Sequence, residues 1–183
     1  EELKKKYPID KKRIYASGFS MGGCKSWDIF QEYPEVFAGL APMSATFEVG
    51  LNVYGKPAPK AINQNVPVPL FYAGGEITPL PELPFQAEKC RDRMEYVFRV
   101  NKVKTPYNVQ FEDRENWENK IFGIHGDKTV VYHDDSRNAD LTVHYFESED
   151  GVCRTAFGSI SGQGHECREH TCETAWQFLK QFT

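Results

Sequence analysis

The sequence lacks three features that would each point to a particular class of protein. No apolar run approaches the roughly 20 residues that cross a bilayer, and the longest ones lie around Leu70–Gly75 and Val36–Met43. There is no excess of basic charge, since 22 Lys and Arg face 26 Asp and Glu for a net charge of -4. The five cysteines are an odd number at irregular spacing, unlike the disulfide framework of a small secreted scaffold. We therefore expect neither a membrane span nor a nucleic-acid partner.

The sequence also lacks an initial Met, and no apolar signal-like segment follows the charged opening Glu1–Lys6. We expect the natural N-terminus to lie elsewhere, and the compartment, cytoplasmic or secreted, stays open, as does the oligomeric state. What is present is enough for a core: 183 residues, of which 40% are hydrophobic and 14% aromatic. This composition predicts a single domain over residues 1–183.

Short apolar runs that alternate with helical patterns predict a mostly parallel α/β sheet. The expected strands are 12–19, 37–43, 66–73 and a pair between Leu141 and Ile160, and the expected helices are 21–33, 86–100 and 171–182. Residues 86–140 contain a long polar stretch with scattered aromatics around Asn116–Glu118. We interpret residues 86–140 as an inserted segment, or a lid over the active site, before the last strand.

A Gly-x-Ser-x-Gly pentapeptide, Gly18–Gly22, stands between a predicted strand and a predicted helix. A sharp turn from strand to helix holds its serine in strained backbone geometry, and glycines two positions away on each side avoid a clash. The hydroxyl of Ser20 then projects above the end of the sheet as a nucleophile. The backbone N–H of Met21, at the start of the helix, is predicted to donate to an oxyanion on the substrate carbonyl.

A serine hydroxyl needs an imidazole to take its proton. His165 is the best candidate, because the loop Ser161–Gly164 places it after a strand and just before the final helix. His170, one turn further along, is a competitor. The remaining histidines are expected to be structural or exposed: His125, His133 and His144.

The carboxylate that orients the imidazole is expected after the strand at 66–73. Glu76 is the first carboxylate beyond that strand and is our primary assignment. The alternatives are Asp134, Asp135, Asp140 and Glu82.

The segments Asp10–Gly23 and Tyr33–Gly39 resemble the α/β-hydrolase esterases of the polyhydroxybutyrate-depolymerase and feruloyl-esterase type. The resemblance extends more loosely to the strand before Glu76 and to Gly164 with His165. It implies an α/β-hydrolase fold, a mostly parallel sheet with helices on both faces. It also implies hydrolysis of a small-molecule or polysaccharide-linked carboxylic ester through an acyl-enzyme on Ser20, without metal or organic cofactor.

The sequence departs from that family at two places. In the family the strand before the acid usually ends in a His-Gly pair followed by an Asp, whereas here Tyr72–Glu76 stands in its place. Several strands and a loop that supplies the second oxyanion N–H precede the serine in the family, but only about ten residues precede the first strand here. We therefore expect this chain to be the C-terminal part of the fold, with the second oxyanion donor outside it. The strand before Ser20 should then have an open edge.

Four other interpretations compete. Zinc could bind a cluster of imidazoles and thiols, His165, Cys167, His170 and Cys172, but the second ligand pair of known structural sites is absent from the sequence. A disulfide from Cys172 to Cys167 or Cys153 is a stronger alternative, with buried free thiols as the default. A peptidase or thioesterase would use the same three residues, and a non-catalytic binding module would hold Ser20 more than about 4 Å from His165.

Overall fold

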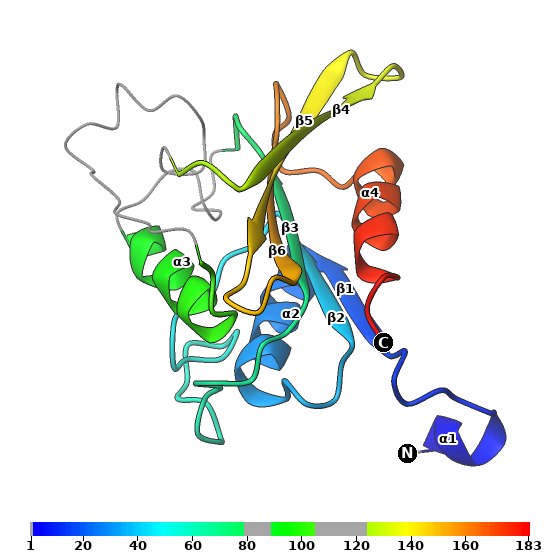
Figure 1. Ribbon diagram of the computed structural model, residues 1–183, viewed down its shortest axis with the longest axis vertical. Helices are drawn as coiled ribbons and strands as arrows, with labels where there is room; N and C mark the ends of the chain where they lie inside the picture. The colour runs from blue at the N-terminus through cyan, green and yellow to red at the C-terminus, as the bar shows by residue number, and fades with distance from the viewer. Residues whose placement is uncertain (1, 79–88, 105–123) are drawn as a thin grey trace.

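One six-stranded sheet runs through the protein, whose computed structural model describes residues 2–78, 89–104 and 124–183 (Figure 1). Its strands follow the order β1 (Tyr15–Phe19), β2 (Gly39–Met43), β3 (Leu70–Gly75), β6 (Cys153–Ile160), β5 (Ala139–Glu147), β4 (Lys128–Asp134). The first four strands in that order are parallel, and β5 and β4 add an antiparallel hairpin. The expectation of a mostly parallel sheet is confirmed.

Helices cover both faces of this sheet (Figure 1). The helices of the described ranges are α1 (Glu2–Lys6), α2 (Met21–Glu32), α3 (Lys89–Val100) and α4 (Glu169–Leu179). On one face, Trp27 of α2 packs against Tyr72 of β3 and Val97 of α3 is buried in the same cluster, and on the other, Phe178 of α4 packs against Phe71. Every residue of β2 and β3 is buried, which is why these strands read as continuous apolar runs. None of the described helices has the length and apolar character that a membrane crossing requires.

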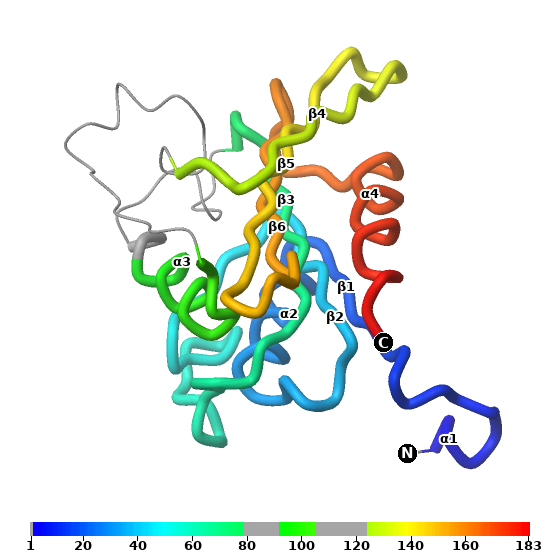
Figure 2. Tube along the Cα trace, in the orientation of Figure 1, coloured from blue at the N-terminus to red at the C-terminus, as the bar shows by residue number. Residues whose placement is uncertain are grey.

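β1 is an edge strand, with β2 on one side and no strand on the other within the described ranges. Its residues are half-buried or exposed, and α1 projects away from the sheet (Figure 2). The open edge that we expected beside Ser20 is therefore present. The C-terminal end of the chain lies near the start of this strand, where the Tyr15 hydroxyl donates to the Phe182 carbonyl and the Tyr15 ring meets Trp176 edge-on. Trp176 itself is 49% exposed.

Two parts of the expected insertion at 86–140 lie in the layered fold. Met94, Val97, Phe98 and Val100 of α3 are buried in the core, and β4 pairs with β5 along its whole length. The periodicity of apolar residues predicted the helix α3. The polar residues on its outer face and the polar stretch that follows it hid the fact that α3 packs on the sheet. Residues 105–123, with Trp117, fall outside the described residues, so a lid there stays a prediction.

Candidate active site

Ser20 sits at a sharp turn between the end of β1 and the start of α2. Its backbone has φ 55° and ψ -119°, a strained conformation for a residue other than glycine. The Ser20 N–H donates to the Met43 carbonyl at 3.1 Å, and the Cys24 N–H donates to the Ser20 carbonyl at 2.9 Å. These bonds tie the turn to β2 and begin the helix at once, so the serine stands at the carboxyl end of the parallel strands.

Two glycines make this turn sterically feasible, but only one of them belongs to the pentapeptide. A Cβ on Gly18 would lie 2.3 Å from the backbone of Gly22, and a Cβ on Gly23 would lie 2.7 Å from the Met43 carbonyl oxygen. A Cβ on Gly22 would meet nothing within 4 Å. The expectation that a side chain at Gly22 would clash is therefore wrong, because the close approach of α2 to β2 falls one residue later.

The structure brings Ser20 and His165 together. The Oγ of Ser20 and the Nε2 of His165 are 2.8 Å apart, within hydrogen-bond distance. The imidazole also lies on the Phe19 ring, with 4.7 Å between ring centroids and 35° between ring planes. The separation is shorter than the one expected of a non-catalytic module.

A set of polar contacts holds the loop that carries His165. Gln163 is 1% exposed, and its side-chain amide donates to the Glu166 carbonyl at 3.0 Å. Arg168 donates to the Glu166 carboxylate at 2.9 Å, which lowers the pKa of that carboxyl. The backbone N–H of Ile77, just after β3, donates to the Gln163 carbonyl at 3.0 Å. The sequence analysis did not single out the side chains of Gln163, Glu166 and Arg168. The position of Gln163 between Gly162 and Gly164 is the one sequence signal that could have indicated its role.

Met21 and Glu76, the other predicted members of the site, have fewer contacts that define their roles. Met21 is the first residue of α2, where backbone N–H groups have no acceptor within the helix. The backbone N–H of Glu76 donates to the Ile160 carbonyl at 3.1 Å, so Glu76 begins beside the loop of His165. Within the described residues, however, the Glu76 carboxylate makes no hydrogen bond to the His165 ring. Its role stays a prediction.

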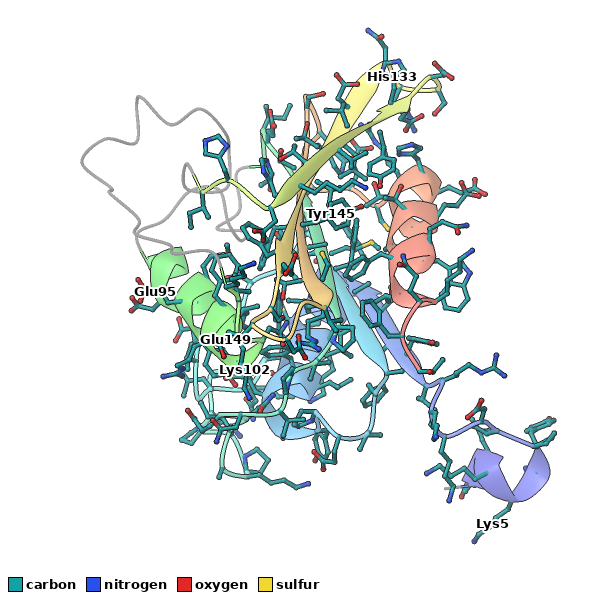
Figure 3. The ribbon with its side chains drawn as sticks, in the orientation of Figure 1. Lys5, Glu95, Lys102, His133, Tyr145 and Glu149 are labelled. Atoms are coloured by element: carbon teal, nitrogen blue, oxygen red, sulfur yellow. The ribbon has the colours of Figure 1, made fainter. Side chains whose placement is uncertain are left out.

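The three alternative aspartates are engaged in the β4–β5 hairpin, whose outer end carries His133 (Figure 3). Asp140 contacts the Nδ1 of His133 at 2.7 Å and raises the pKa of that imidazole, and Asp135 is 3.6 Å from its Nε2. Asp134 accepts from the Ser136 hydroxyl at 2.6 Å, which lowers the pKa of Asp134. Glu82 lies outside the described residues.

His170, the competitor of His165, is the second residue of α4, where its backbone carbonyl accepts from the Thr174 hydroxyl at 2.9 Å. The buried His144 and the cysteines of the candidate zinc cluster make separate contacts. His144 is 3% exposed, bonds to Thr129 across the hairpin at 3.1 Å, and has its pKa lowered by burial. Cys167 and Cys172 are exposed, not buried, and face each other with 3.6 Å between sulfurs. No three potential metal-ligating side chains gather within the described ranges.

Comparisons with known proteins point to the same architecture. No family model matches the chain. The chain is 41% identical over 183 residues to the bifunctional acetylxylan esterase/xylanase XynS20E of Neocallimastix patriciarum; the match covers all of this chain and 22% of that protein. The chain thus spans about a fifth of the length of this curated relative. The crystal structure of a single-substitution variant of Arabidopsis thaliana SOBER1 superposes with a TM-score of 0.50 at 11% identity, over 98% of this chain and 58% of that one. At this identity the likeness shows the fold alone.

Proposed function

We propose, from the α/β-hydrolase fold that this chain has, that it hydrolyses carboxylic esters through a serine nucleophile. The observation that carries the proposal is the 2.8 Å approach of the Ser20 Oγ to the His165 Nε2 at a strained strand-to-helix turn. A serine hydroxyl is a poor nucleophile at neutral pH, and an imidazole at this distance can take its proton as it attacks. Backbone strain at such a turn is typical of a functional position.

The reaction follows from these positions. The Ser20 oxygen attacks the ester carbonyl while His165 accepts the hydroxyl proton, and the Met21 N–H donates to the oxyanion that forms. The carbon–oxygen bond to the alcohol then breaks, and the leaving alcohol takes the proton from His165. A water molecule next gives its proton to His165 and attacks the acyl-enzyme. The carboxylic acid leaves as Ser20 regains its proton.

We propose that the carboxylate orienting His165 comes from the segment after β3, with Glu76 as the primary candidate. Its backbone adjoins the loop of His165 through the bond to Ile160. Glu82 follows in the same segment. The variants Glu76→Gln and Glu82→Gln separate the two: loss of the orienting carboxylate is expected to lower kcat by roughly 10²–10⁴-fold, and the other substitution should leave it near the wild-type value.

The substrate that we propose is an acyl ester borne on a polysaccharide. This rests on the relative named as an acetylxylan esterase/xylanase, whose identity of 41% extends over the whole of this chain. A small acyl group joined to a sugar hydroxyl is the ester type that this name describes.

Kinetics on an ester, a thioester and an amide of the same acyl group test the reaction class. The ester should have the highest kcat/KM, and Ser20→Ala should abolish its hydrolysis. Ser17→Ala, on the exposed position of the same strand, is the matched control and should keep wild-type rates. Preference for the amide or the thioester would replace the esterase assignment by a peptidase or a thioesterase.

A further inference from the structure

We propose that Cys167 and Cys172 are a redox modification site: under oxidising conditions they form an intrachain disulfide that fastens the loop of His165 to the first turn of α4. Their sulfurs are 3.6 Å apart and both residues are exposed. A disulfide requires a sulfur separation of about 2.05 Å. The two side chains therefore need to approach by only about 1.5 Å, within reach of small rotations about their own bonds.

The geometry of the helix start explains why the two thiols meet. Arg168 is the N-cap of α4, so Cys167 occupies the position before the cap and Cys172 the fourth position of the helix. Side chains at these two positions pack against each other in a hydrophobic staple, which fixes the angle at which the chain enters a helix. The first turn is closed by the Cys172 N–H, which donates to the Arg168 carbonyl at 3.1 Å. The pair is thus placed by local structure, and a disulfide would make the staple covalent.

A disulfide at the start of α4 would restrain groups that contact the active site. The Arg168 side chain makes no capping hydrogen bond and instead binds Glu166 in the loop. Cys172 also lies 4.0 Å from the sulfur of Met43, and the Met43 carbonyl accepts the Ser20 N–H. The pair therefore lies between the loop that carries His165 and the strand end that supports Ser20.

The chemistry is thiol–disulfide exchange with a small disulfide such as oxidised glutathione as the oxidant. The Cys167 thiolate attacks one sulfur of glutathione disulfide and releases one glutathione thiolate. The Cys172 thiolate then attacks the mixed disulfide and releases the second. Two protein thiols are oxidised, one glutathione disulfide is reduced, and the two protons end on glutathione. Cys172 is exposed as a residue, but its sulfur is partly buried at the contact with Met43. This burial, followed by the contact with Cys167, raises the pKa of Cys172 to about 11, so we assign Cys172 the second, intramolecular step.

The direct test counts thiols. The purified chain is incubated with oxidised glutathione, denatured and alkylated, and its mass and linked peptides are measured. Two of the five cysteines should escape alkylation, and a peptide joining Cys167 to Cys172 should appear. Cys153→Ser, an exposed cysteine at the start of β6, is the matched control and should behave as wild type. Full alkylation, a stable glutathione adduct on Cys167, or a pair that includes Cys153 would overturn the proposal.

Thermal unfolding and proteolysis test whether the disulfide restrains the loop that carries His165. Closing so short a loop should raise the Tm of the oxidised protein by roughly 4 °C and slow proteolysis within residues 161–168, and Cys172→Ser should show neither change. An unchanged Tm and cleavage rate in protein with the bond formed would overturn the fastening. Neither measurement uses catalysis, so failure here is distinguishable from failure of the proposed esterase activity.

Discussion

Gln163 shows at the scale of a residue how a buried side chain can set the position of His165 without touching a substrate. Gln163 lies two residues before His165. Its side-chain amide donates to the backbone carbonyl of Glu166, on the other side of His165, and its backbone carbonyl accepts from the Ile77 N–H. The loop is thereby bridged internally and anchored to the end of β3. Gln163 is in this sense a positioning residue.

Gln163→Glu replaces the donating amide by a carboxylate that repels the Glu166 carbonyl. We expect kcat to fall about tenfold or more, since small misplacements of a catalytic group carry such costs, while KM stays within about twofold. Steady-state kinetics on the folded variant measure both. Gln64→Glu, on an exposed glutamine, should leave both constants unchanged. A Gln163→Glu enzyme that is folded and has wild-type kcat would contradict the positioning role.

At the scale of elements, one side chain joins the end of α3 to two strands. Asn101 is fully buried; its amide accepts from the Val68 N–H at 2.8 Å and donates to the Val68 carbonyl at 2.9 Å and the Thr155 hydroxyl at 2.8 Å. Val68 precedes β3 and Thr155 lies in β6. A single residue thus satisfies the polar groups where a helix and two parallel strands converge.

Asn101→Ala leaves these buried groups without partners, so we expect the free energy of unfolding to fall by about 3 kcal/mol. Urea denaturation measures the change, as a lower midpoint at constant slope. Asn65→Ala, at an exposed site in the nearby loop, should cost less than about 0.5 kcal/mol. Equal stability of the two variants would show that the Asn101 contacts add nothing to the junction.

At the scale of the whole molecule, buried His144 makes global stability depend on pH. Burial lowers its folded-state pKa below the ordinary value of 6.5, so the unfolded chain binds a proton more readily than the folded one. This contribution is fully present above pH 6.5 and is lost as pH falls from there toward the folded-state pKa. The urea midpoint of the wild type should therefore be lower at pH 5.5 than at pH 7.5. The same drop in midpoint should be smaller for His144→Gln. His133→Gln is the contrasting variant: because Asp140 raises the pKa of the exposed His133 imidazole, removing that imidazole should enlarge the drop. An undiminished drop in His144→Gln would rule out His144 as the source.

Much of the architecture was predictable from the sequence because local signals agree with the final packing. β2 and β3 are buried on both faces and therefore read as apolar runs, and His165 was found because a glycine-rich loop separates a strand from a helix. Asn101 was not predictable, since its partners Val68 and Thr155 reach it only when distant segments pack. That α3 packs its apolar side on the sheet was hidden for a related reason, since its neighbours in the sequence are polar; the interpretation of residues 86–140 as an insertion stays a prediction.

The activated serine is tested most directly with a fluorophosphonate probe, which bonds its phosphorus to the nucleophilic oxygen and releases fluoride. Peptide mapping of the labelled protein should place the adduct on Ser20 alone. Labelling should disappear in Ser20→Ala and fall strongly in His165→Ala, because the 2.8 Å contact supplies the base. Folded wild-type protein that does not label at Ser20, or labelling that survives in His165→Ala, would contradict a Ser20–His165 nucleophile.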